Sequence, residues 1–506
     1  MRKSLLGAAL ICALAASSTA SAQSHFLRGD TNGDSAINIG DAVATLSFLF
    51  SGGATPTCAD AADVNDDGAI NIADAVSLLS FLFSGGPAPA APFPTWEADP
   101  TADSLTCKGT IVDLTGDIVS DMMLSNTNTY RLVSGTFVKA PATLTIQPGT
   151  TLLGDSATNG FLVIEAGAQI NAAGTEVAPI VFTSDQPVGS RLRSDWGGVL
   201  LLGMGQNNNP GGVSPTEGIT ASWGGGATPD NDDSSGTMTY CRIEYGGTEI
   251  SVDNEINALS MFGVGRGTTL HHIAVKQNFD DGFEWFGGAA DLKFGIAIGI
   301  GDDDFDYSQG WIGRGQFWVT QKRDGGNDGF ECDNNEFDFT ALPLTLPTIS
   351  NVTLIGTDTA SRFGVVFRRG VGGIVFNAIV QNWGNAGVDI DDAATTAHSP
   401  ANGELVLDYT TFFDNTENAE TGDSEVALAY TSVDFVNTLN GNNAFPGASP
   451  TVDPYNLTSP DFRTAAGQIL PFIPADPFFT DVNYVGAVAP TGTAWTASSW
   501  ISYLNN

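Results

Sequence analysis

The chain has 506 residues, of which 60 are glycine and 9% are aromatic, a composition that favours a turn-rich β protein. Its 57 acidic residues and only 19 lysines and arginines give a formal net charge of −38. Such a charge repels nucleic acid and anionic membranes and attracts cations, so we expect no nucleic-acid partner.

The N-terminus has the features of a secretory signal. Arg2-Lys3 precedes an apolar run over residues 5–16, and small residues follow up to Ala22. We therefore predict a Sec-type signal peptide over residues 1–22 and an extracellular or cell-surface product. No later stretch approaches the ~20 apolar residues of a membrane helix, so membrane insertion is not expected.

Two segments that begin at Asp30 and Asp63 repeat one oxygen-rich pattern, and each leads into an apolar segment ending in Phe-Leu-Phe-Ser-Gly-Gly. Side-chain oxygens at loop positions 1, 3, 5, 9 and 12, with a backbone carbonyl at position 7, are the ligands that Ca²⁺ requires. The alternative is a pair of Asx-rich turns that cap two helices without a metal. The predicted calcium ligands are Asp30, Asn32, Asp34, Ala36, Asn38 and Asp41, and then Asp63, Asn65, Asp67, Ala69, Asn71 and Asp74.

With Asp at loop position 12 and Ala-Val-x-x-Leu after it, this segment resembles the dockerin family. The resemblance implies a small α-helical, calcium-binding module over residues 26–86, and a cohesin-like protein or a surface scaffold as its partner. The sequence departs from the family in two places. Ser35 replaces the turn glycine of the first loop, and Ile39-Gly40 and Ile72-Ala73 replace the Ser-Thr pair that many dockerins use to recognise cohesin.

Four cysteines follow the predicted signal peptide. Cys58 and Cys107 flank the second repeat and are the better candidates for a disulfide in an oxidising compartment. Cys241 and Cys332 are predicted to lie about three rungs apart, or ~14 Å at ~4.8 Å per strand. That separation exceeds disulfide reach, so we expect two buried free thiols.

Proline and alanine dominate residues 87–94, and we expect residues 87–109 to be an extended, semi-rigid linker. The chain then changes to strands and turns, with a unit that recurs every 22–35 residues. Two strands per unit with bulky aliphatic side chains inside predict a mainly β fold, a right-handed parallel β-helix, over residues 110–415. Residues 416–506 are expected to supply a final coil and a cap. A β-sandwich is the alternative, but it does not explain a unit of this length.

One of the repeated strands has apolar residues at its first, fourth and sixth positions. We assign these positions to Tyr240/Ile243/Tyr245 in one copy and to Leu270/Ile273/Val275 in another. Two longer insertions, at residues 207–235 and 333–347, are predicted to be loops on the coils.

The other repeated strand carries acidic residues. The pattern Asp281-Gly-Phe-Glu-Trp recurs in altered form at Asp303 and Asp328, and alternation along each strand directs the aromatic residues inward and the acid outward. Stacked carboxylates repel one another, which leaves three hypotheses: a solvated acidic face, a calcium site, or a catalytic site. The residues of this acidic ladder are Asp281, Glu284, Asp303, Asp306, Asp328 and Glu331; Val366 interrupts the column and Asp389 resumes it.

The body resembles a group of secreted bacterial β-helix proteins of poorly characterised function, on stretches such as Asp195-Trp-Gly-Gly and Tyr240-Cys-Arg-Ile-Glu-Tyr. The resemblance implies the architecture and no particular reaction. We therefore expect a secreted calcium-binding protein that binds a polysaccharide or a cell surface. The alternative is a polysaccharide-degrading enzyme, either a lyase or an O-glycosyl hydrolase.

No catalytic residues are assigned from the sequence. The chain lacks the Gly-His-Gly and Arg-Ile-Lys elements of pectin-hydrolysing β-helices. His271-His272 is not expected to bind a metal, because neighbours on a strand face opposite sides. A lyase needs a basic residue, for which the candidates are Lys276, Arg314, Arg362, Arg368 and Arg369.

Overall fold

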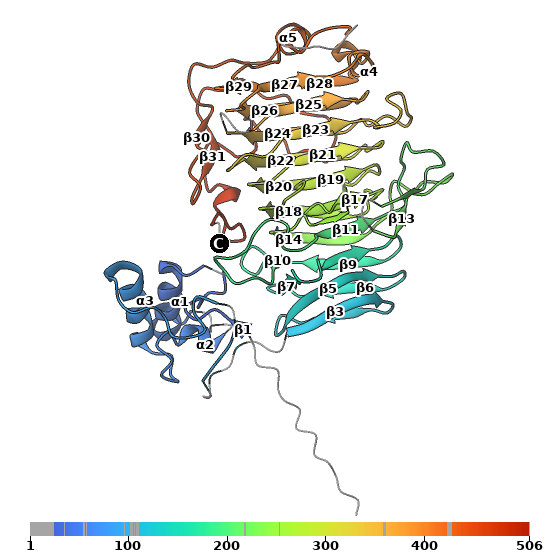
Figure 1. Ribbon diagram of the computed structural model, residues 1–506. Helices are drawn as coiled ribbons and strands as arrows, with labels where there is room; N and C mark the ends of the chain where they lie inside the picture. The colour runs from blue at the N-terminus through green and yellow to red at the C-terminus, as the bar shows by residue number, and fades with distance from the viewer. Residues whose placement is uncertain are drawn as a thin grey trace, which may run out of the picture.

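The structure is a computed structural model. It describes residues 25–34, 36–53, 56, 58–95, 97–101, 105, 107, 111–216, 219–251, 254–357, 361–421 and 428–504. The predicted signal peptide over residues 1–22 and the substituted Ser35 lie outside the described residues. Figure 1 shows a small helical module beside a long stack of strands.

The N-terminal module contains three helices, α1 (Ile39–Phe50), α2 (Ala59–Ala62) and α3 (Ile72–Ser84). Asn38 and Asn71 cap α1 and α3, and in each helix an aspartate three residues later closes a capping box. The apolar faces of the two long helices meet in a small core that includes Ala42, Ala75 and Leu78. The two repeats therefore fold as equivalent loop–helix units.

The segment that we expected to be an extended linker folds back on the module in its described part. The amide of Ala90 donates to the carbonyl of Val64 (3.1 Å), and Phe93 packs edge-on against Phe81 of α3. The strand β1 (His25–Phe26) also pairs with β2 (Glu97–Ala98). The described part of this segment therefore packs on the module, and the assignment of residues 87–109 to a linker stays a prediction.

Arg28 and a disulfide close the module. The buried guanidinium of Arg28 donates to the carbonyl oxygens of Asp60 (3.0 Å) and Asp63 (2.7 Å) and to the carboxylate of Asp99 (3.0 Å). Cys58 and Cys107 form the predicted disulfide. The described cysteines Cys241 and Cys332 are free and buried, as predicted.

The body is a parallel β-helix in one sheet of 23 strands, which Figure 1 shows as a regular stack. Its strands in chain order are β3 (Ile111–Ile118), β4 (Met122–Leu124), β5 (Thr129–Val138), β6 (Thr143–Ile146), β7 (Thr151–Gly154), β8 (Phe161–Ile164), β9 (Gln169–Ala173), β10 (Ile180–Ser184), β11 (Val199–Leu202), β14 (Gly236–Glu244), β17 (Leu259–Phe262), β18 (Thr269–Lys276), β19 (Phe283–Phe286), β20 (Leu292–Ile298), β21 (Phe305–Ser308), β22 (Arg314–Gln321), β23 (Phe330–Asp333), β24 (Thr348–Ile355), β25 (Phe363–Arg368), β26 (Gly373–Gln381), β27 (Ala386–Ile390), β28 (Leu405–Asp408) and β29 (Thr411–Phe413).

Short elements lie outside this sheet. They are the antiparallel pairs β12 (Ser214–Pro215) with β13 (Ser222–Trp223), β15 (Glu249–Ser251) with β16 (Asn254–Glu255) and β30 (Thr451–Asp453) with β31 (Asp461–Thr464), the helices α4 (Ala393–Thr396) and α5 (Ser432–Asp434), the π-turn Phe435–Leu439, and the 3₁₀ turns Pro400–Asn402 and Trp495–Ala497.

Each full coil has three paired strand segments rather than the two that we expected. Long strands such as β14 and β18 bend in the middle, so that each belongs to two faces of the solenoid. The bend is a single residue with a left-handed backbone, such as Tyr240 (φ 49°), His272 (φ 54°) or Phe294 (φ 60°). The sequence hid the bend because aromatic and imidazole residues occupy it in place of the usual glycine.

The bend also explains the first–fourth–sixth pattern. In β18 the bend at His272 separates Leu270 from Ile273 and Val275, and these three side chains are all buried. The register pairs Leu270 with Met238 and Ile273 with Cys241, so our assignment of Tyr240/Ile243/Tyr245 was displaced by two residues.

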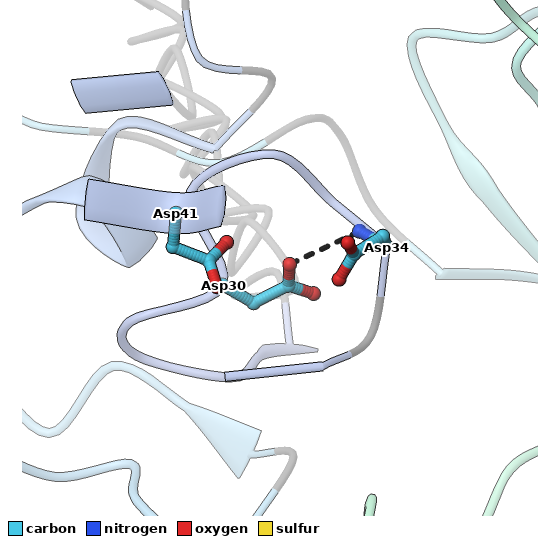
Figure 2. Close-up of side chains that lie close together, drawn as sticks. All are labelled: Asp30, Asp34 and Asp41. Carbon is cyan, nitrogen blue, oxygen red and sulfur yellow. Dashed lines mark hydrogen bonds between the residues drawn. The ribbon is translucent and has the colours of Figure 1, made fainter. Parts of the chain in front are cut away.

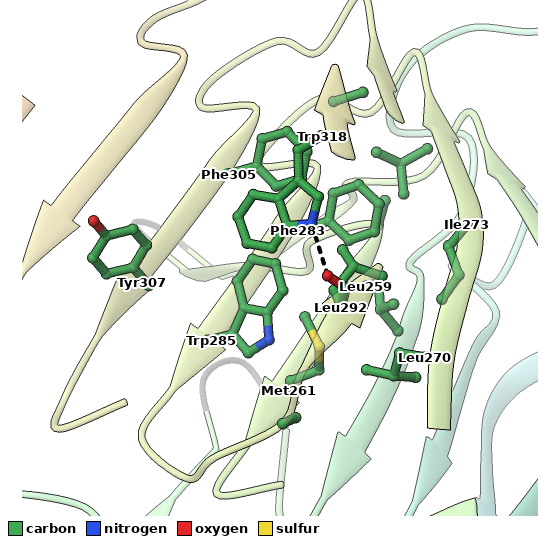
Figure 3. Close-up of a cluster of buried hydrophobic side chains, with 14 of the residues drawn as sticks. Leu259, Met261, Leu270, Ile273, Phe283, Trp285, Leu292, Phe305, Tyr307 and Trp318 are labelled. Atoms are coloured by element: carbon green, nitrogen blue, oxygen red, sulfur yellow. Dashed lines mark hydrogen bonds between the residues drawn. The ribbon is translucent and has the colours of Figure 1, made fainter. Parts of the chain in front are cut away.

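Stacked aromatic side chains fill the centre of the solenoid. The rings of Phe283 and Phe305 lie parallel at 4.9 Å, and Trp285 stacks on Trp318 at 5.2 Å. Figure 3 shows this stack among aliphatic side chains, with the indole nitrogen of Trp318 donating to the carbonyl of Leu292 (3.0 Å). Trp285 is therefore a core residue, and its inward neighbours hold the acidic strands in place.

The C-terminal segment only in part forms the expected final coil and cap. The last strands of the solenoid sheet are β28 and β29. Residues 451–504, the C-terminal arm, run back along the bent corner of the solenoid (Figure 1). Successive coils donate to backbone carbonyls of the arm, as Asn377 does to Phe472 (2.7 Å) and Asn351 to Tyr484 (2.9 Å). None of the described helices is long and apolar enough to cross a membrane.

Candidate functional site

The two predicted calcium loops have the same internal hydrogen bonds. The amide of Asp34 donates to Asp30 Oδ1 and the amide of Asp67 donates to Asp63 Oδ1, both at 3.1 Å. The last carboxylate of each loop likewise accepts from the amide of the residue at loop position 9. Substitution of the turn glycine in the first loop therefore leaves its described fold equivalent to that of the second.

The first loop gathers three carboxylates. Oxygens of Asp30, Asp34 and Asp41 lie within 4.8 Å of one another, and Figure 2 shows all three side chains inside the loop. Burial raises the pKa of Asp41 to about 7 and that of Asp74, its counterpart in the second loop, to about 6. An all-oxygen donor set in which carboxylates crowd without a cation matches the chemistry of Ca²⁺.

The module also exposes two equivalent apolar ridges. Matching positions of α1 and α3 carry large apolar side chains that are 55–67% exposed. They are Ile39, Val43 and Phe50 on α1, and Ile72, Val76 and Phe83 on α3. Paired apolar patches of this kind are typical of protein-binding surfaces.

The acidic column of the solenoid has the predicted register. Glu284 pairs with Asp306, Asp306 with Glu331, and the column then passes through Val366 to Asp389. However, the acids do not spread into solvent. Glu284, Asp306 and Glu331 are only 7–9% exposed, so the solvated acidic face is excluded.

A second column of carboxylates lies beside the first, at the corner where each acidic strand begins. Asp281 accepts from the amide of Asp303 (2.9 Å), and Asp303 accepts from the amide of Asp328 (2.5 Å). Asn257 occupies this corner one coil earlier and accepts from the amide of Asp281 (3.2 Å). Sequence analysis missed Asn257; the available signal was its position two residues before Leu259, which pairs with Phe283.

The two columns meet in two three-carboxylate clusters. Ligand oxygens lie within 4.8 Å of one another in the cluster Asp281–Glu284–Asp306 and again in the cluster Asp303–Asp328–Glu331. We call the six residues together the double carboxylate ladder. Sequence analysis named all six, and the structure brings them into one site.

The ladder contains buried carboxylate oxygens that accept no hydrogen bond. Asp306 Oδ1 and Asp328 Oδ2 are buried and have no hydrogen-bond partner in the described part of the chain. Burial, together with neighbouring carboxylates, raises the pKa of Asp281 and of Asp306 well above the usual range and that of Asp328 to about 7. Burial and mutual repulsion therefore disfavour the ionised form of these aspartates, and a divalent cation bound among them would offset both effects. The donor set, all oxygen and partly unpartnered, fits a hard divalent cation.

A cavity of about 620 Å³ opens over the ladder, and we call it the acidic groove. Glu284, Asp306 and Glu331 line it together with Asp333 and Glu336. Residues of both predicted insertions, at 207–235 and 333–347, also line it. Aromatic side chains also line it; these are Trp223, Phe262, Phe286 and Phe337, the last 89% exposed.

Three of the five candidate basic residues lie at the ladder. Arg368 pairs with Glu331 and Asp333, and Arg369 Nη1 lies 2.6 Å from Asp333 Oδ2. Arg362 Nη1 lies 3.8 Å from Asp328 Oδ2.

The other two basic candidates belong elsewhere. Lys276 is buried against Glu244 (3.3 Å), and Arg314 pairs with Asp291 and Asp476. The structure therefore places neither of them among the ion pairs of the ladder.

The expectation for His271-His272 was wrong in its premise. The left-handed backbone at His272 interrupts the alternation of β18, and the two Nδ1 atoms lie 2.9 Å apart. Neighbouring residues at this corner therefore lie on the same side of the solenoid.

Two family models match the chain. The model described as a pectate-lyase-like β-helix domain matches residues 116–450, and the model described as a dockerin type I domain matches residues 28–82. Among curated proteins and among solved structures, none matches the chain.

Proposed function

The chain belongs to the pectate-lyase-like β-helix family and carries a dockerin type I domain, and from this we propose that it is an exported calcium-binding protein that binds a polysaccharide in its acidic groove. The dockerin domain attaches it to a cohesin of an extracellular scaffold. The observation that carries the proposal is the groove itself, because an elongated row of polar groups flanked by aromatic side chains is suited to sugar rings.

Calcium has two places in this proposal. Dockerin type I domains bind calcium, and we assign the oxygens in this chain to the twelve predicted ligands, six in the loop from Asp30 to Asp41 and six in the loop from Asp63 to Asp74. The double carboxylate ladder is the second place, supported by its unpartnered oxygens on Asp306 and Asp328. A cation there neutralises the floor of the groove and leaves coordination positions for hydroxyl or carboxylate groups of a glycan.

The test is affinity gel electrophoresis of the full chain on a panel of plant and algal polysaccharides, with and without Ca²⁺. We expect retardation by at least one polysaccharide, lost in the Glu284→Gln/Glu331→Gln variant. Asp389→Asn is the matched control, since this residue continues the column beyond Val366. Equal migration of the wild type on every polysaccharide contradicts the proposal.

The attachment is tested separately with a type I cohesin. The apolar ridges are equivalent, so we expect Ile39→Arg or Ile72→Arg alone to leave binding in place and the double variant to abolish it. Loss of binding in either single variant contradicts the equivalence of the two ridges.

A second function, polysaccharide degradation, is favoured by the carboxyl groups beside Arg368 and Arg369. Burial raises the pKa of Asp333 to about 7, so at neutral pH this group is divided between acid and base forms. Such a carboxyl group is suited to proton transfer. Release of reducing ends from the polysaccharides would identify a hydrolase, and formation of unsaturated uronates would identify a lyase. If neither product forms with any polysaccharide of the panel, the enzymatic function is rejected and only polysaccharide binding remains.

A further inference from the structure

A further candidate metal site lies on the bent corner of the solenoid. Its side chains are not those of the double carboxylate ladder or of the calcium loops. His271 and His272 are two of the four histidines of the chain and are consecutive on β18. Both are half-buried, and the bend at His272 directs them to the same side, with 2.9 Å between their Nδ1 atoms.

The distance between the two nitrogens selects a coordination geometry. Two imidazole nitrogens bound at about 2.05 Å lie about 2.9 Å apart when the angle at the metal is near 90°, and about 3.3 Å apart when it is tetrahedral. The observed 2.9 Å is the length of a hydrogen bond between the two rings, and it equals the separation of adjacent positions in a square-planar or tetragonal centre. Among common divalent ions Cu²⁺ and Ni²⁺ adopt this geometry, and Cu²⁺ binds imidazole more tightly.

Aromatic rings hold His272 in position. Its ring stacks between Tyr240 at 4.4 Å and Phe294 at 4.3 Å, and Trp500 of the C-terminal arm meets it edge-on at 5.8 Å. This packing restricts rotation of the ring, so the ligand geometry is preformed. A preformed ligand pair loses little conformational entropy when it binds an ion.

A cavity of about 410 Å³ adjoins the pair and is lined by Thr268, Thr269 and Phe478 among others. This space leaves room for water or a small ligand at the remaining coordination positions.

We propose that His271 and His272 form a two-nitrogen site for Cu²⁺ on the outer corner of the solenoid, open on the side of this cavity. The strongly negative net charge of the chain raises the local concentration of divalent cations around it. The site is separate from the calcium ligands in chemistry, because hard oxygen ligands and imidazole prefer different ions.

The test is titration of Cu²⁺ into the full chain in saturating Ca²⁺, followed by electron paramagnetic resonance. All proteins carry His25→Asn, which removes the histidine nearest the N-terminus. We expect one tight Cu²⁺ per chain with hyperfine splitting from two imidazole nitrogens, and Zn²⁺ bound at least tenfold more weakly. His272→Phe keeps the aromatic stack and should lose this signal, as should His271→Asn.

His398→Asn is the matched control and should behave as the parent protein. Two outcomes overturn the proposal: a spectrum that is unchanged in His272→Phe, or Zn²⁺ bound as tightly as Cu²⁺. The first result means that Cu²⁺ binds elsewhere and that the pair is a neutral histidine–histidine hydrogen bond within the aromatic stack. The second means that the pair has no preference for a square-planar ion.

Discussion

Aspartate at the corner of each acidic coil gives the ladder its chemistry. An asparagine is sufficient to cap the next coil, as Asn257 shows: its Oδ1 accepts from the amide of Asp281 while its amide group donates to Glu284. Aspartate caps in the same way through one oxygen but has no donor to offer the neighbouring acid. Its second oxygen therefore adds negative charge to a buried cluster, and that charge calls for a proton or a cation.

Substitution of Asp306, a strand residue in the same buried cluster as the corner aspartate Asp281, tests whether this cluster requires a proton or a cation. In chelator, Asp306→Asn should raise the melting temperature of the solenoid, because it removes a buried carboxylate oxygen that lacks a partner, a group that costs about 1–3 kcal/mol. In millimolar Ca²⁺ the order should reverse, since only the wild type gains a ligand. Tryptophan fluorescence during thermal unfolding measures the melting temperature in chelator and in Ca²⁺, with Asp389→Asn as the control. If the melting temperature of the wild type is the same in chelator and in Ca²⁺, the cluster does not bind Ca²⁺.

Glu244 gives a second prediction, on pH. Burial by itself raises the pKa of Glu244, but Lys276, Arg242 and Arg191 outweigh burial and lower it to about 2. Because the folded-state pKa lies below the ordinary value of 4.5, the ionised group stabilises the fold fully above about pH 4.5 and loses this effect as the pH falls towards 2.

Glu244→Gln should therefore lower the free energy of unfolding by about 3–5 kcal/mol at pH 7, since it leaves buried cations without their counter-charge. The difference from the wild type should shrink at pH 3. Urea unfolding at both pH values measures it, and Asp461→Asn, which breaks a more exposed pair with Arg463, should have little effect. Equal stability of Glu244→Gln and the wild type at pH 7 excludes this role.

At the scale of elements, α1 and α3 depend on the loops that precede them. Each helix is capped by a loop residue, Asn38 or Asn71, and its capping box uses the last carboxylate of the same loop. The module has only a small apolar core of its own. Cation binding in the loops should therefore couple directly to helix formation.

Removal of calcium tests this coupling. In excess chelator the circular dichroism signal of the helices should fall while the β-sheet signal of the solenoid remains, and added Ca²⁺ should restore it. Asp41→Asn in the first loop and Asp67→Asn in the second loop should each reduce the helix signal that Ca²⁺ restores. Full helicity in chelator would mean that the loops are metal-free capping turns.

Local patterns identified the repeating elements but not their shape. The spacing of Phe283, Phe305 and Phe330 is enough to predict stacked coils, and the register of Glu284, Asp306 and Glu331 follows from it. The bends do not follow, because a left-handed backbone at Tyr240 or His272 is imposed by the stack and leaves no glycine in the sequence.

At the scale of the whole molecule, distant segments convert an acidic strand face into a site. Residues 209–216 and 333–337 are inserted in different coils, yet both line the acidic groove. Alternation along one strand correctly predicts that Glu284 points away from the core, but it carries no information on what covers that face. Burial of the ladder, and with it the exclusion of a solvated face, was therefore beyond sequence analysis.

The C-terminal arm likewise makes long-range contacts that local sequence patterns do not predict, here at the bent corner of the solenoid. Its contacts with Lys276 and Asn377 join residues that lie more than 90 positions apart in the chain. Sequence analysis assigned no contacts to the side chains of the bent corner, whereas in the structure several of them bind the arm. Trp500 of the arm thereby contacts His272, and no local sequence pattern predicts this contact.

The central claim is that the double carboxylate ladder binds a divalent cation, and calcium stoichiometry tests it most directly. Isothermal titration of Ca²⁺ into the full chain should show more bound ions than the two loops of the module hold. The Asp281→Asn/Asp306→Asn variant should lose the additional ion and keep the loop sites unchanged. The same stoichiometry in the variant and the wild type would contradict the claim.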